Sequence, residues 1–188
     1  MYPEDAADAI SEYDYGLHCL IIYSDLSTLR KFYSRYIPQQ MKDKKEFIQI
    51  HPFYETEESV RQVLYKGDKR IIDDKKVIED EDKSLMIVDS LSKYSGQEND
   101  AESIWSANQE MVKYGNGLGN KGVSIIGDMG SFLFKNRIEE LLDYELCLPR
   151  RFEVNLKGIC LYHQKDFDKL SEYQMKTITE QHEKVIKI

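Results

Sequence analysis

The chain has 188 residues, of which 41% are hydrophobic, so it can bury one substantial core in a single domain. Its 34 acidic and 26 basic side chains give a net charge of -8, which repels polyanions and argues against a nucleic-acid-binding surface. No apolar run approaches the roughly 18 residues that span a bilayer, and the start of the chain lacks a secretory signal, so we expect a soluble, cytoplasmic protein without membrane contacts.

The N-terminal segment is acidic, with five acids and no base in its first 14 residues. Its apolar residues are scattered. We therefore expect residues 1–15 to form an arm that is either loosely held or a short helix docking on a partner. Residues 16–188 are expected to form one domain.

The first apolar run, from Leu17 to Tyr23, lacks alternation, which predicts a strand covered on both faces, at the centre of a sheet. Ser24 or Asp25 then caps a helix that ends near Pro38. A second strand at Glu46–Ile50 and a helix at Thr56–Leu64 follow. The alternation of strands and helices is typical of a parallel sheet.

The rest of the chain repeats this alternation after a charged excursion at residues 66–83, which we expect to form a hairpin or a short helix. A capping box of Asn99 and Glu102 predicts the start of the next helix. The later elements are predicted as strands at 84–89, 123–127 and 156–162 and helices at 99–114, 135–148 and from Asp166 to the C-terminus. Five strands with interleaved helices predict an α/β fold, a three-layer α/β/α domain with a mostly parallel sheet.

The three cysteines indicate neither a disulfide framework nor a CxxC metal site. Cys19 and Cys160 lie in strand-like runs, where a thiol packs as a small hydrophobe, and Cys147 lies near a helix end. The glycines of residues 117–122 match G-x-G-x-x-G, but they follow a helix and precede a strand. A dinucleotide site needs the opposite order, so we interpret this segment as a helix stop and turn.

The turn after the first strand also lacks a phosphate-binding loop. It has neither a glycine nor a Lys-Ser/Thr pair, and Asp25 puts negative charge where a phosphate would bind. Asp89 and Asp128 end two later strands, which is where an NTPase carries the aspartate that holds Mg²⁺. Without a phosphate-binding loop, however, nothing positions a triphosphate beside them. They are more simply interpreted as caps, and no NTPase activity is expected.

The apolar runs carry a family resemblance. HCLIIYSD, LMIVDSLSKY, GVSIIGDMGSFLF, LLDYELCL and GICLYHQKDFD follow one another, over residues 16–186, in an order that resembles the MEDS (methanogen/methylotroph sensory) domain family. The most specific parts are the Gly127-Asp128-Met129 turn, similar to the family's Gly-Glu-Met, then Tyr144-Glu145, and the strand Ile159–Tyr162 with Phe167 after it. The resemblance implies a RecA/KaiC-like fold that has lost its Walker A loop. It further implies a sensory module of signalling or transcriptional proteins that binds a small organic ligand.

The strand ends of a parallel sheet converge at one edge, where ligands bind. The residues just past the predicted strands combine aromatic groups with carboxylates, which is typical of a pocket for an apolar body with one polar group. The candidate ligand-binding residues are Tyr23, Ser24, Asp25, His51, Phe53, Asp89, Asp128, Met129, Tyr162 and His163. Loop, cap and core roles remain alternatives for each of them. Asp89, Asp128, His51 and His163 offer metal-ligating atoms, but their spacing is not diagnostic, so no metal site, catalytic residue or cofactor is predicted.

Three functions remain open. The first is a non-enzymatic sensory domain that takes a small organic ligand or a signalling protein partner at the carboxyl edge of the sheet. The second is an interaction or assembly subunit that keeps only the oligomer contacts of an ATPase-like fold, which the 13 tyrosines favour because tyrosine is common at interfaces. The third is residual nucleotide binding through Asp89 and Asp128.

Overall fold

The computed structural model describes residues 1–67, 84–94 and 100–188. The strands among these residues form one parallel sheet of six, in the order β3-β2-β4-β5-β1-β6. The strands are β1 (His18–Tyr23), β2 (Glu46–His51), β3 (Leu85–Ile87), β4 (Gly122–Asp128), β5 (Leu156–His163) and β6 (Lys184–Lys187). The predicted α/β class is therefore confirmed.

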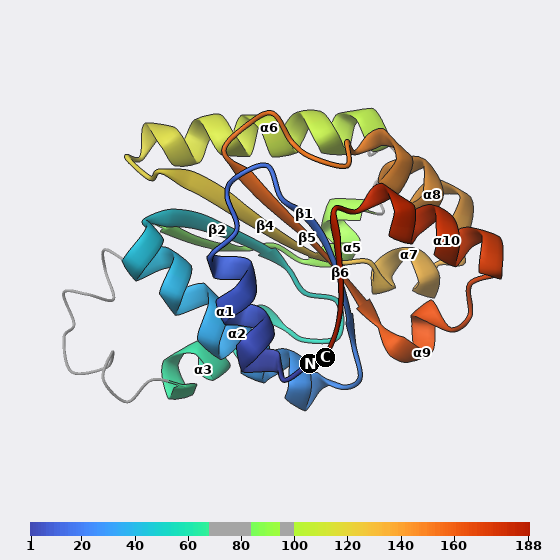
Figure 1. The fold of residues 1–188 in the computed structure, drawn as a ribbon, viewed down its shortest axis with the longest axis horizontal. Helices are drawn as coiled ribbons and strands as arrows, with labels where there is room; N and C mark the ends of the chain where they lie inside the picture. The colour runs from blue at the N-terminus through green and yellow to red at the C-terminus, as the bar shows by residue number, and fades with distance from the viewer. Residues whose placement is uncertain (68–83, 95–99) are drawn as a thin grey trace.

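Helices cover both faces of this sheet (Figure 1). One layer holds α1 (Pro3–Ser11), α2 (Leu26–Gln39), the π-helical turn η1 (Gln40–Lys44) and α3 (Glu57–Gly67). The other face carries α6 (Ala101–Gly117), α8 (Ile138–Cys147) and α10 (Glu172–Gln181), and the short helices α5 (Ser90–Tyr94), α7 (Gly130–Phe134) and α9 (Gln164–Phe167) lie near the strand ends. Because successive strand residues point to opposite faces, β1 contributes to both cores: Leu20 and Ile22 pack toward α6 and α8, and Cys19 and Ile21 toward α2.

The prediction that the first strand is central was wrong. β4 and β5 occupy the middle of the sheet, and β1 lies between β5 and the edge strand β6. All six residues of β1 are nonetheless buried, because helices cover both of its faces and β6 covers its outer side. A continuous apolar run therefore reports two-sided burial and not position in the sheet.

The C-terminal segment also differs from the prediction of one helix capped by Asp166. Asp166 lies inside α9, and α10 begins after Ser171, whose side chain forms a capping box with Gln174. The last residues then form β6, which pairs in parallel with β1. A four-residue edge strand with a lysine at each end carries little local signal, and it forms because β1 offers a free edge.

Two helix boundaries also differ from the prediction. The helix predicted at 135–148 is α8, which begins only at Ile138, because Asn136 before it adopts a left-handed φ of 53° and ends the unpredicted short helix α7. The N-cap of α6 is Asp100, whose carboxylate accepts the Ser103 N–H at 2.8 Å; Asn99 lies outside the described residues. The predicted stop after α6 is confirmed, and Gly119 has a φ of 87° there. From residue 68 the charged excursion also lies outside the described part of the chain.

The acidic N-terminal segment is not a separate arm. It is the helix α1, which packs on α2 of the same chain, and its Ala6, Ala7 and Ile10 are fully buried. The helix alternative was thus correct, and the apolar face of the helix packs on this domain. Its acids lie on the exposed side, where Asp8 pairs with Arg35 at 2.7 Å.

Ile10→Ala should therefore lower the free energy of unfolding by about 2–3 kcal/mol, because it removes buried methylene groups and leaves a cavity between α1 and α2. Urea denaturation followed by circular dichroism measures this loss. Glu4→Ala, on the exposed side of α1, is the matched control and should change stability by less than about 0.5 kcal/mol. Equal stabilities for Ile10→Ala and the wild type would show that α1 detaches without consequence.

Candidate functional site

The turn between β1 and α2 is where a phosphate-binding loop would lie, and a carboxylate occupies it. Asp25 Oδ1 accepts the Thr28 N–H at 2.9 Å and so caps α2. This backbone hydrogen bond lowers the pKa of Asp25, which keeps the group ionised at the helix N-terminus. Ser24 is exposed, with its Oγ 3.2 Å from Thr28 Oγ1. The turn is therefore complete in itself and repels a phosphate.

Asp128, at the end of β4, is buried and bonded to the protein. The Tyr23 hydroxyl donates to its Oδ2 at 2.7 Å, and the Gly130 N–H donates to its Oδ1 at 2.9 Å. Burial raises the pKa of Asp128 to about 7, and these two hydrogen bonds only partly oppose that shift. The carboxyl group is therefore poised between its neutral and ionised forms near physiological pH.

Asp89 serves as a cap, as the simpler interpretation predicted. It is exposed, and its Oδ1 accepts the Ser92 N–H at 2.8 Å in the first turn of α5. The end of β3 is nevertheless linked to β4, because the Ser90 hydroxyl donates to the Asp128 carbonyl at 2.9 Å. The two aspartates differ in environment and do not form a paired carboxylate site.

His51 and Met129 point inward from the same edge. His51 Nδ1 lies 2.8 Å from the Tyr94 hydroxyl, and its Nε2 has no hydrogen-bond partner among the described residues. Burial lowers the pKa of His51 to about 3, so the imidazole is neutral. Met129 is fully buried in the core on the α6 side. Both side chains are therefore buried beneath the carboxyl edge of the sheet.

Aromatic side chains form a connected row across the carboxyl edge, which we call the aromatic row. Its rings are Tyr23, His163, Tyr54, Phe53 and Phe134, and successive ring centroids lie 5.2, 5.5, 4.7 and 5.7 Å apart. Tyr23 is buried at one end, whereas Phe134 is 68% exposed at the other. The row brings together Tyr23, Phe53 and His163 of the predicted site, close to Asp128.

Tyr162 does not belong to this site, which corrects the prediction. Neighbouring residues on a strand point to opposite faces, so Tyr162 faces α8 while His163 joins the aromatic row. The Tyr162 hydroxyl donates to Glu145 Oε1 at 2.5 Å. This hydrogen bond is part of a separate polar cluster around Glu145, on the face of the sheet that α8 covers.

Sequence reasoning missed two residues of the edge. The Tyr54 hydroxyl donates to Asp166 Oδ2, and Lys169 pairs with Asp166 Oδ1 at 2.6 Å. Tyr54 follows Phe53 directly, so the aromatic pair was a usable signal. Asp166 was interpreted as a helix cap, and only the packing of α9 against the strand ends brings it here.

Comparison with known proteins gives a fold and no family. No protein-family model and no curated protein sequence matches the chain. A KaiC-like protein from the hyperthermophilic archaeon Pyrococcus horikoshii OT3 has a similar solved structure, with a TM-score of 0.56 and 15% identity, over 92% of this chain and 72% of that chain. The predicted RecA/KaiC-like fold is thereby supported, whereas the resemblance to MEDS domains stays a prediction. No helix among the described residues is long and apolar enough to cross a membrane.

Proposed function

We propose that this chain is a non-enzymatic sensory domain that binds a small organic ligand at the aromatic row. The observation that carries the proposal is the row itself, a line of five rings that runs from the buried Tyr23 to the exposed Phe134 at the carboxyl edge of a parallel sheet. Ligands of such sheets bind at this edge. An apolar surface with few polar groups suits an organic molecule better than a phosphorylated one.

The polar groups beside the row give it a means of orienting such a ligand. The Tyr54 hydroxyl is held by Asp166, and Tyr54 is 41% exposed, so part of this residue is open to solvent. The capped turn at Asp25 and the enclosed Asp128 disfavour a nucleotide at the same edge. Recognition without hydrolysis is what this combination supports.

Native mass spectrometry of freshly purified protein, compared with its denatured mass, tests the proposal. A retained organic mass is expected. Phe134→Ala should lose at least about tenfold in retention with a stability change below about 0.5 kcal/mol, because the ring is mostly exposed. Tyr173→Ala is the matched control, since Tyr173 is 74% exposed on α10, outside the row, and this variant should retain the ligand.

Three outcomes contradict the proposal. An oligomer without added mass would favour the interaction or assembly subunit, and equal retention by the two variants would place the ligand elsewhere. Mg²⁺-dependent nucleotide hydrolysis that Asp128→Asn abolishes would establish an enzyme instead. Native mass spectrometry and a nucleotide hydrolysis assay on the same purified proteins distinguish these outcomes.

A further inference from the structure

A second polar cluster lies inside the domain, on the face of the sheet that α8 and α10 cover. Its members come from four segments: His18 on β1, Cys160 on β5, Glu145 on α8 and His182 directly after α10. His18 and Cys160 share one face because His18 pairs with Gly158, two residues before Cys160. None of the four is more than 4% exposed. Four polar side chains at this depth need a partner that offsets their burial.

The distances within the cluster are close to those of a tetrahedral metal site. Cys160 Sγ lies 3.6 Å from His18 Nε2 and 3.9 Å from Glu145 Oε2. Glu145 Oε2 lies 4.0 Å from His18 Nε2 and 3.5 Å from His182 Nε2, and all four ligand atoms fall within 4.8 Å of one another. Zinc bonds of about 2.0–2.3 Å at tetrahedral angles separate neighbouring ligand atoms by about 3.3–3.7 Å, so small side-chain shifts bring all four onto one ion.

Both imidazoles are oriented for ligation. His18 Nδ1 lies 3.1 Å from the Pro149 carbonyl, and His182 Nδ1 lies 2.7 Å from the Ile178 carbonyl. A carbonyl only accepts, so each Nδ1 carries a proton, and the ring tautomer with its single proton there presents the lone pair of Nε2 to the cluster. His182 Nε2 has no hydrogen-bond partner among the described residues. An imidazole held through its other nitrogen by a backbone carbonyl is the usual arrangement of a metal-bound histidine.

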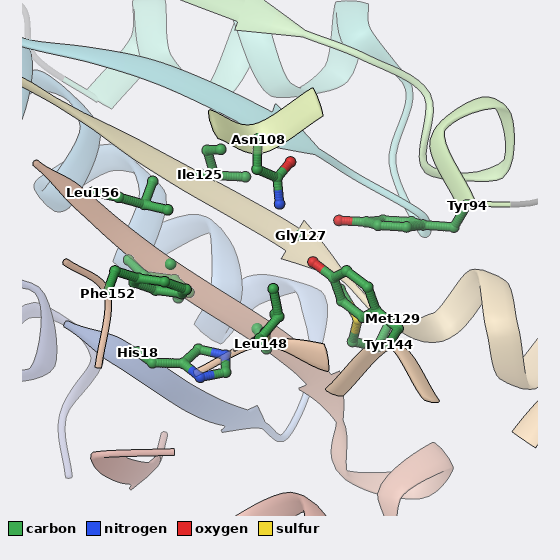
Figure 2. Close-up of a pocket in the computed structure, with 13 residues that line it drawn as sticks. His18, Tyr94, Asn108, Ile125, Gly127, Met129, Tyr144, Leu148, Phe152 and Leu156 are labelled. Atoms are coloured by element: carbon green, nitrogen blue, oxygen red, sulfur yellow. Dashed lines mark hydrogen bonds between the residues drawn. The ribbon is translucent and has the colours of Figure 1, made fainter. Parts of the chain in front are cut away.

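The surroundings support the carboxylate and exclude bulk water. Tyr162 donates its hydroxyl to Glu145 Oε1, which leaves Oε2 facing the other three groups. A cavity of about 10 Å³, room for about one water, adjoins the cluster. His18, Leu148 and Phe152 line one end of this cavity, and Tyr94 and Tyr144 the other (Figure 2). Because the four cluster side chains are themselves buried, bulk solvent does not reach them.

We propose that His18, Glu145, Cys160 and His182 bind one zinc ion as a closed, structural metal site. Two nitrogens, one sulfur and one carboxylate oxygen form a ligand set that zinc accepts in tetrahedral geometry. Four protein ligands leave no position for a substrate, so the ion stabilises the fold and does not catalyse a reaction. The ion joins α8 and the segment after α10 to β1 and β5, and it anchors the chain just before the edge strand β6. This inference does not depend on the function proposed for the aromatic row.

Metal analysis of the full chain, purified without chelators, tests the site. Inductively coupled plasma mass spectrometry should find about one zinc per chain in the wild type and much less in Cys160→Ala and Glu145→Gln. Cys19→Ala is the matched control, because it removes a buried sulfur on the opposite face of the sheet and should keep its zinc. Circular dichroism verifies that each variant is folded.

Cobalt substitution and thermal stability distinguish a metal site from a cluster of hydrogen-bonded side chains that holds no ion. Cobalt added to metal-depleted wild type should produce the intense visible absorption of a tetrahedral site and a sulfur-to-metal band that Cys160→Ala lacks. A chelator should lower the melting temperature of the wild type, and added zinc should restore it. Folded wild type that binds neither zinc nor cobalt overturns the proposal. Zinc retained equally by Cys160→Ala and Glu145→Gln also overturns it, because the ion would then lie elsewhere.

Discussion

Lys157→Met should lower the free energy of unfolding by about 3–5 kcal/mol, because it leaves the buried carboxylate of Glu46 without its cation. The two groups lie 3.1 Å apart at the amino end of the sheet, and their side chains are only 3% and 1% exposed. Lys157 Nζ also donates to Gln40 Oε1 at 3.1 Å and to the Ser11 carbonyl at 3.3 Å. Glu46 Oε2 accepts the Ser124 hydroxyl at 2.6 Å. Removing the lysine therefore takes the cation from Glu46 and a donor from both Gln40 Oε1 and the Ser11 carbonyl.

A double-mutant cycle distinguishes the pair from simple loss of packing. Lys157→Met combined with Glu46→Gln should recover about 1–3 kcal/mol of the loss, because the remaining side chain is neutral. Lys44→Met is the matched control: Lys44 pairs with Glu12 at 3.0 Å on the surface, and its loss should cost less than about 1 kcal/mol. Chemical denaturation compares the wild type, Lys157→Met, Glu46→Gln, the double variant and the Lys44→Met control. Additive effects of the two core substitutions would show that the buried charges do not interact.

Asp128→Asn should change how stability depends on pH. Burial raises the pKa of Asp128 from 3.8 to about 7 in the folded protein, so between these values the folded state keeps a proton that the unfolded state releases. Folded protein then binds more protons, and its stability falls as pH rises through this window. The asparagine variant lacks that titration. Relative to wild type, it should gain about 2–4 kcal/mol of unfolding free energy between pH 4 and pH 8.

The groups around Asp128 define the controls for this measurement. Tyr23 and the Gly130 N–H oppose the shift through hydrogen bonds, whereas the charge of Asp166 adds to it. Asp143→Asn, on the exposed side of α8, should keep the wild-type pH profile. Denaturation curves at several pH values give the comparison. Parallel profiles for Asp128→Asn and the wild type would mean that Asp128 titrates alike in the folded and unfolded chain.

The candidate edge was only partly predictable. Tyr23, Phe53, Asp128 and His163 follow apolar runs, and the convergence of parallel strand ends was enough to group them. Tyr162 was assigned wrongly because a run without alternation does not tell which residue of a neighbouring pair points to which face. Residues that follow a strand by more than one or two positions, such as Asp166, reach the edge only through the path of the next helix.

The sequence by itself determined the class of fold and the absence of a phosphate-binding loop. Both depend on neighbouring residues: apolar runs and helical periodicity specify strands and helices, and a loop without glycine, capped by Asp25, cannot cradle a phosphate wherever it lies. Tertiary structure alone decided the strand order, the pairing of β6 with β1 and the cluster of His18, Glu145, Cys160 and His182. The four cluster residues lie far apart along the chain, and no spacing connects them. Their meeting depends on the register between β1 and β5 and on how α8 and α10 pack over that face of the sheet.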